Sequence, residues 1–157
     1  MERVVEESYQ KAVRCYRTAD HLLTQTYPFV NDPKLLLTVL ENLFLAMSNA
    51  MAAILHQEFV QKRIPPFGET FDDKLNAVKL HIARRYGIVG EDLSMAAEIK
   101  SILLAHKKSP MEFVRKDVFV ICSDNYQLQT LSAQQIKAYY ARAKVFIEAI
   151  GSILRHG

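Results

Sequence analysis

The feature that most constrains the fold is a long apolar stretch over residues 35–55. Its apolar side chains recur at alternating steps of four and three residues, and a second stripe recurs every seven residues. This pattern predicts a helix that packs against neighbours on two sides. The first stripe holds Leu36, Leu40, Leu43, Met47, Ala50 and Ile54, and the second holds Leu37, Phe44 and Met51.

A membrane span is the competing interpretation of this stretch, because its length approaches that needed to cross a bilayer. However, the stretch contains Glu41, Asn42, Ser48 and Asn49. Each charged or strongly polar group near the centre of a bilayer costs about 2–3 kcal/mol, which favours a buried helix in a soluble bundle. We therefore expect the central helix of a bundle and no membrane partner.

The rest of the chain predicts an all-α fold in one domain, residues 1–157. The chain has only five glycines and five prolines, which favours long helices over a turn-rich β fold. Further helices are expected over 2–26, 70–86 and 91–107 and from Ser132 onward, with the central helix ending near Lys62. These helices predict an antiparallel up-and-down bundle of about five members. The boundary signals are Tyr27-Pro28, Asp32, Thr70, Gly87 and Ser132.

The segment over 109–130 carries mixed signals. Ser109-Pro110-Met111-Glu112 has the pattern of a capping box, which predicts a short helix that includes Phe113 and Val114. The run 118–121 is β-branched and aromatic and prefers an extended conformation, so its state stays open between a short helix and an irregular segment. Six apolar residues within the nine positions 113–121 predict that the segment is ordered and packed on the bundle.

Several chemistries lack their sequence signals. The two cysteines, Cys15 and Cys122, lie far apart and belong to no cluster with metal-ligand spacing, so we expect no metal. Glycine-rich loops for nucleotides and the common hydrolase motifs are also missing, so we expect no cofactor. The first residues contain no apolar leader, which predicts a cytoplasmic protein.

The first two predicted helices resemble those of the HEPN superfamily of helical bundles. The resemblance rests on the segments 16–23 and 40–46. Ribonucleases of that superfamily carry an arginine followed, after four to six residues, by a histidine, and they pair two such motifs across a homodimer. The resemblance implies that Arg14 and His21 are the candidate catalytic pair. Both lie opposite the apolar seam, so the competing interpretation is an exposed outer face of the first helix.

Basic residues cluster near the predicted helix ends. In an up-and-down bundle the ends of the second and fourth helices share one pole, where Arg115 and Lys116 could join them. Such a pole could bind the phosphates of RNA or another polyanion. The competing interpretation is that cations near helix C-termini are stabilised by unpaired carbonyls. The residues expected at this pole are Arg3, Lys62, Arg63, His106, Lys107 and Lys108.

Taken together, the sequence favours a non-enzymatic binding or interaction module over an enzyme. The alternative is an RNA-binding protein or a HEPN-type ribonuclease. Surplus apolar surface on the central or the last helix predicts a homodimer. Any ligand is expected to contact the segment 108–130, where Asp124 and Asn125 join Arg115 and Lys116 in an outward patch.

Overall fold

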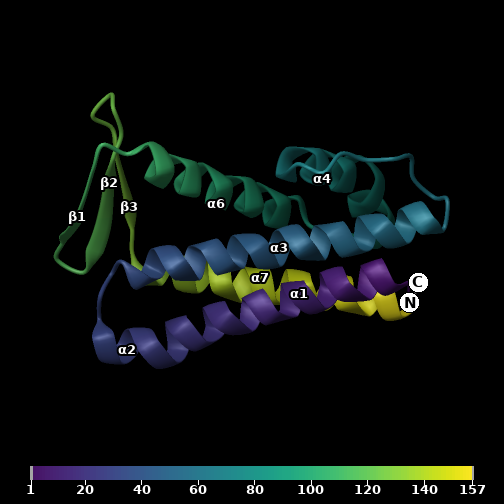
Figure 1. Cartoon of the computed structure of the whole chain (residues 1–157), viewed down its shortest axis with the longest axis horizontal. Coiled ribbons are helices and arrows are strands. Elements are labelled where there is room, and N and C mark those ends of the chain that lie inside the picture. Colours follow the sequence, from purple (N-terminus) through teal and green to yellow (C-terminus); the bar gives the residue numbers. More distant parts are fainter. Residues whose placement is uncertain (1, 157) are drawn as a thin grey trace.

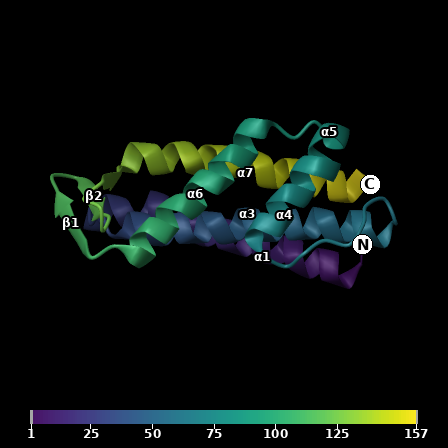
Figure 2. The same cartoon turned by 90° about the horizontal axis from the view of Figure 1, so that it is seen from above.

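A computed structural model of the chain describes residues 2–156 and shows a helical bundle with a small sheet at one end (Figure 1 and Figure 2). The longer helices are α1 (Arg3–His21), α3 (Leu35–Val60), α6 (Gly90–Lys108) and α7 (Ala133–His156). The short helices are α2 (Tyr27–Val30), α4 (Phe71–Ala77) and α5 (Ala83–Tyr86). Two π-helical turns, Leu22–Thr26 and Val78–Ile82, join α1 to α2 and α4 to α5. The strands are β1 (Met111–Arg115), β2 (Val118–Cys122) and β3 (Leu128–Leu131).

The apolar helix α3 is central, as predicted. It packs against α1 and α7, while α4 and α6 lie across its other side (Figure 1). Both predicted stripes point inward, and of their members only Phe44 is less than fully buried. By length and composition α3 could cross a membrane. However, 61% of its 18-residue apolar stretch is buried by the rest of the structure. The two stripes are therefore explained by packing inside the bundle.

The first helical segment runs further than predicted, because Pro28 does not end it. α1 passes into the π-helical turn, where the N–H of Tyr27 bonds to the carbonyl of Leu22. Pro28 then lies in the first turn of α2, where a missing N–H leaves no helical hydrogen bond unmade. The segment ends at Asn31, whose φ of 52° is left-handed.

The other predicted helix boundaries are confirmed to within two residues. Thr70 and Ser132 each accept a hydrogen bond from a backbone N–H in the first turn of a helix. Asp32 accepts one from Lys34 in the turn before α3, so it precedes the N-cap of that helix and does not occupy it. Gly87 follows α5 with a φ of 69°, the left-handed conformation that glycine adopts without strain. Local capping chemistry therefore marks the starts of α4 and α7 and the end of α5.

The chain after α3 turns back along that helix before α4 begins. The ring of Phe71, at the start of α4, packs against Phe44 in the first half of α3, with ring centroids 4.7 Å apart. At the end of α5, the Tyr86 hydroxyl reaches Glu58 in the last turn of α3. The stretch from α4 to α5 therefore runs in the same direction as α3, and α6 returns in the opposite direction (Figure 2).

The fold is mostly helical but not purely all-α, because residues 111–131 form a three-stranded antiparallel sheet in the order β1-β2-β3. The predicted short helix around Phe113 and Val114 is wrong, since both residues belong to β1. Ser109 caps no helix; its hydroxyl lies 2.8 Å from the carbonyl of Cys122 and ties β1 to the end of β2. The extended preference of 118–121 is confirmed, and full pairing of β1 with this strand outweighs the capping-box preference.

Candidate functional site

The predicted basic residues lie at opposite ends of the molecule, so the single basic pole is wrong. Lys62 and Arg63 follow the end of α3, whereas Lys107 and Lys108 end α6 beside the start of α3 (Figure 1). The 26 residues of α3 separate these two positions by about 40 Å. The prediction failed because it assumed that each helix runs antiparallel to the one before it. Instead, the stretch from α4 to α5 runs parallel to α3. We call the two regions the arginine end (residues 58–63 and 85–86) and the sheet end (residues 107–131).

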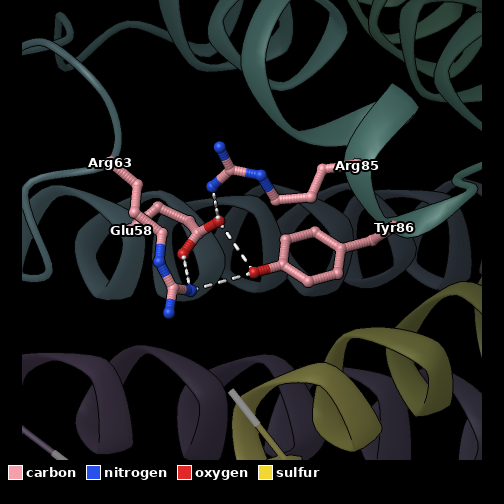
Figure 3. A network of polar contacts seen from close by, with 4 residues as sticks. All are labelled: Glu58, Arg63, Arg85 and Tyr86. Atoms are coloured by element: carbon pink, nitrogen blue, oxygen red, sulfur yellow. Dashed lines mark hydrogen bonds and ion pairs between the residues drawn. The ribbon is translucent and has the colours of Figure 1, made fainter.

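A buried carboxylate organises the arginine end. Glu58 is fully buried in the last turn of α3, and three groups donate hydrogen bonds to it (Figure 3). These are the Arg63 guanidinium at 2.9 Å, the Arg85 guanidinium at 3.0 Å and the Tyr86 hydroxyl at 2.8 Å. Arg63 also donates to the Tyr86 hydroxyl at 3.2 Å. The network joins the end of α3, the loop that follows it and α5.

The backbone after α3 places Arg63 against Glu58. The N–H of Arg63 donates to the Glu58 carbonyl, and the N–H of Lys62 donates to the Phe59 carbonyl. This is the Schellman helix ending, with Lys62 in the left-handed conformation at a φ of 61°. Such endings commonly carry an apolar contact between the two residues that are Glu58 and Arg63 here. In this protein an ion pair takes the place of that contact.

The network at the arginine end stabilises the fold and does not form an anion clamp. Figure 3 shows the guanidinium groups of Arg63 and Arg85 on opposite sides of the Glu58 carboxylate, with their outer nitrogens pointing apart. The two groups therefore do not converge on one ligand position. The hydrogen bond to Glu58 raises the pKa of Arg63, and burial together with the bond to Glu58 raises the pKa of Tyr86. Both shifts favour the protonated forms that the network requires.

The sheet end carries exposed cations. Lys107 and Lys108 precede β1, while Arg115 ends it and Lys116 follows, so this strand has positive charge at both ends. All four side chains are exposed, and within residues 2–156 none of them forms an ion pair. The structure therefore brings together two of the predicted basic pairs and separates them from Lys62.

The other two predicted binding residues, Asp124 and Asn125, lie in the exposed turn between β2 and β3. Ser123 holds this turn: its hydroxyl contacts Asn125 and donates to the carbonyl of Gln127. Tyr126 lies in this turn with a φ of 63°, and it is 87% exposed. Because β1 starts opposite the end of β2, the turn lies at the same end of the strands as the end of α6. All four predicted residues are therefore exposed, but they do not form one patch, because Arg115 and Lys116 lie at the other end of β1.

The strand register gives the sheet one face that joins the core and a second face on which Met111 and Leu128 are exposed while Val120 is buried. Phe119 and Ile121 of β2 and Leu131 of β3 join the hydrophobic core. Side chains alternate along a strand, so the neighbouring positions lie on the other face, which we call the outer face. The outer face holds Met111, Phe113, Arg115, Val118, Val120, Cys122, Leu128 and Thr130. All but two of these residues are apolar.

The segment is ordered and packs on the bundle, but less completely than predicted. Phe119, Val120 and Ile121 are buried, whereas Phe113 and Val114 stay 39% and 41% exposed. The reason is the position of β1, which is the strand furthest from the helices in both views (Figure 1 and Figure 2). Its side chains have the rest of the molecule on one side only.

One contact between polar side chains links the sheet to α6. Nδ1 of His106, near the end of α6, lies 2.5 Å from the carboxylate of Glu112 in β1. Next to it, a groove of about 280 Å³ runs between α3 and α6. Its lining is Glu41, Phe44, Lys100, Leu103, Leu104, His106 and Lys107. One of its two lysines, Lys100, is already paired with Asp72.

Arg14 and His21, the candidate catalytic pair, both lie exposed on α1. They are two turns apart, about 10 Å along the helix axis. Within residues 2–156 neither side chain forms an ion pair or lines a groove described above. The exposure agrees with the interpretation of an outer helix face, and a role for the pair in catalysis stays a prediction.

Among residues 2–156, no group of three or more histidine, cysteine or acidic side chains could hold a metal ion. Cys15 and Cys122 are both free and partly buried.

Sequence reasoning missed Glu58, although a signal was present. The stripe of Leu37, Phe44 and Met51 recurs every seven residues, and its next member is Glu58. A charged residue at a buried position needs a partner, and Arg63 is near in sequence. Reasoning from sequence also missed the exposed strand β1, because the local pattern there predicted a helix.

The fold and sequence were compared with known proteins. No protein-family model, no curated protein and no solved structure matches the chain.

Proposed function

We propose that the protein is a non-enzymatic interaction module that binds another protein at its sheet end. The observation that carries this proposal is the exposed apolar outer face. Met111 and Leu128 there are 60% and 64% exposed, although both strands are regularly paired. Contiguous apolar patches on a protein surface commonly mark interaction sites. The His106–Glu112 pair holds this face in a fixed orientation on the bundle.

The polar groups of the molecule support binding over catalysis. A catalytic site needs polar side chains that converge on one position where a substrate can lie. The densest polar network of the described chain surrounds Glu58, and its members bond to one another. At the sheet end the cations lie at both ends of a strand of five residues, about 17 Å long, and do not converge.

The first test separates a binding face from a structural one. We expect the double variant Met111→Thr and Leu128→Thr to keep its free energy of unfolding within about 0.5 kcal/mol, because side chains that are 60% and 64% exposed contribute little to folding. Threonine keeps the strand preference of these positions. A loss of more than about 2 kcal/mol, measured by urea denaturation, would mean that the face belongs to the core and would contradict the proposal.

The second test asks what the face touches. A photo-crosslinking residue in place of Leu128 is expected to yield a discrete protein adduct in cells. The same residue in place of Gln25, which is exposed near the end of α1, is the control and should yield none. Adducts that form equally from both positions, or that disappear after ribonuclease treatment, would contradict a protein partner.

RNA binding is the second candidate, and a specific observation favours it. The sheet end carries four exposed cations and two exposed rings, Phe113 and Tyr126, and cations with aromatic rings are the groups that bind single strands. In a filter-binding assay with total RNA, this function predicts affinity that falls steeply with salt and with Lys107→Glu and Lys108→Glu. Cleavage products that vanish in His21→Ala would instead favour a HEPN-type ribonuclease. We favour a protein partner because most of the outer face is aliphatic rather than aromatic.

A further inference from the structure

We infer that the free edge of β1 accepts an extended acidic segment of a partner protein, which adds a fourth strand to the sheet. This inference rests on the proposed function and specifies the chemistry of its partner. It differs from burial of the outer face alone, because the main chain of β1 would supply the hydrogen bonds.

The edge of β1 is open along most of its length. β1 pairs only with β2, and it is the outermost strand in both views of the molecule (Figure 1 and Figure 2). In such a strand, the N–H and C=O groups of every second residue face away from the neighbouring strand. Among residues 2–156, a polar side chain bonds to the main chain of β1 only at Met111, through the Ser109 hydroxyl. The edge from Glu112 to Arg115 remains available.

This edge lacks most of the devices that normally protect one. Edge strands are commonly blocked by an internal proline, a bulge, a lysine within the strand or a covering helix or loop. β1 contains no proline, and its pairing with β2 is regular from Met111 to Arg115. Glu112 does not guard the edge, because its carboxylate is paired with His106. What remains is charge at the two ends of the strand.

The charge pattern selects an acidic partner. Lys107 and Lys108 lie before β1, and Arg115 and Lys116 lie at its other end. An added strand with acidic residues at both ends would bring opposite charges together at both of these positions. Exposed ion pairs contribute more to partner choice and register than to affinity. The apolar residues Phe113 and Val114 in the middle of β1 favour apolar residues in the middle of the added strand.

The same pattern disfavours a second copy of this chain at this edge. Antiparallel pairing of two β1 strands about Phe113 would place Arg115 of each copy opposite Met111 of the other, close to Lys108. Parallel pairing would place each cation beside its own equivalent. Both arrangements bring like charges together, which destabilises the pair.

The test uses the full chain and a synthetic peptide as the probe. The peptide has two glutamates at each end and alternating valine and threonine between them, and the control peptide carries lysines in place of the glutamates. We expect fluorescence anisotropy to show binding of the acidic peptide that is about tenfold tighter than binding of the control. We also expect amide hydrogen exchange to slow at residues 112–115 when the acidic peptide is bound.

Charge reversal provides the sharper form of the test. The variant Lys107→Glu, Lys108→Glu, Arg115→Glu and Lys116→Glu should prefer the lysine peptide. A matched control with the same change of net charge is Lys11→Glu, Lys137→Glu, Lys144→Glu and Arg155→Glu, which alters exposed residues on α1 and α7. The control should keep the preference for the acidic peptide, which separates local pairing from the overall charge.

Proline variants test whether the main chain binds. Either Phe113 or Val114 points its N–H away from β2, so one of the variants Phe113→Pro and Val114→Pro spares the sheet. The variant that keeps the wild-type circular dichroism spectrum is expected to lose the acidic peptide. Retained affinity in that variant would overturn pairing at the edge.

The remaining outcomes separate this inference from the proposed function. Equal affinity for the two peptides, or no binding of the acidic one, overturns the inference, while crosslinking from Leu128 still tests the proposed function on its own. A peptide that slows amide exchange in β3 but not at residues 112–115 also overturns strand addition at the edge of β1. That result would support binding at the outer face. Protection of the same strands by a ten-nucleotide uridine RNA, with no peptide binding, contradicts both and favours the RNA alternative.

Discussion

The arginine end and the sheet end carry the same kinds of cation in opposite situations. Arg63 and Arg85 bind the buried carboxylate of Glu58, whereas Arg115 and Lys116 lie exposed and, within residues 2–156, form no ion pair. A basic residue near a helix end is therefore no guide to binding until its counterion is located. The comparison predicts that changes at the arginine end alter stability and that changes at the sheet end alter binding.

The largest expected effect is at Glu58. We expect Glu58→Gln to lower the free energy of unfolding by about 2–3 kcal/mol, less than for a fully buried ion pair because Arg63 and Arg85 are 40% and 45% exposed. Urea denaturation measures this loss. The matched change at the sheet end, Lys107→Ala with Lys108→Ala, should cost under about 0.5 kcal/mol. Similar losses in the two variants would remove the distinction between the ends.

A second change tests packing between the helices that meet near the arginine end. A Cβ atom added at Gly151 in α7 would lie 2.1 Å from the hydroxyl oxygen of Tyr9 in α1. We expect Gly151→Ala to destabilise the protein by about 1–3 kcal/mol, because the ring must move within a packed interface. Adding Tyr9→Phe removes the closest atom and should restore part of the loss in thermal denaturation. No rescue would show that the cost arises elsewhere.

The network at Glu58 also predicts a loss of stability at alkaline pH. The pKa of Tyr86 is raised by burial and by its bond to Glu58, so the folded state holds the phenol proton more tightly than the unfolded state. The stabilisation is complete below about pH 10, the pKa of an unfolded tyrosine, and is lost as the pH rises through the folded value. Tyr86→Phe should therefore lose less stability than the wild type as the pH rises above about 10. Other tyrosines with raised pKa values, such as Tyr140 beside Asp20, contribute equally to both proteins.

The smallest expected effect concerns two lysines in the left-handed conformation, one at each end. Lys62 has a φ of 61° and Lys116 a φ of 55°. Lys62→Gly and Lys116→Gly should each stabilise the protein by about 0.5 kcal/mol, because glycine adopts this conformation without strain. Only Lys116→Gly should weaken binding of the acidic peptide. If Lys62→Gly weakened it as much, the peptide would not depend on the charges beside β1.

Predictions from local patterns succeeded where local chemistry decides the structure. The stripes of α3 and the caps at Thr70 and Ser132 depend on residues within one or two helical turns, so the sequence contains the whole signal. The ending at Gly87 depends on one residue that accepts a positive φ.

Long-range contacts decided the parts that could not be predicted. The direction of α4 follows from the packing of Phe71 on Phe44, which are 27 residues apart in the sequence and share no periodic pattern. The strand β1 exists because Val118–Cys122 pairs with it, whereas its own residues satisfy a helix-capping pattern. Both errors moved predicted site residues: the first separated Lys62 and Arg63 from Lys107 and Lys108, and the second made Phe113 part of an exposed strand.

The path of α1 and α7 has a practical consequence for measuring these interactions. α1 begins and α7 ends at the arginine end, the length of α3 away from the sheet (Figure 1). A tag on either terminus would therefore anchor the molecule to a sensor surface with β1 facing the bulk solution. Immobilised molecules would present one uniform orientation to an injected peptide, and neither tag would compete for the strand under study.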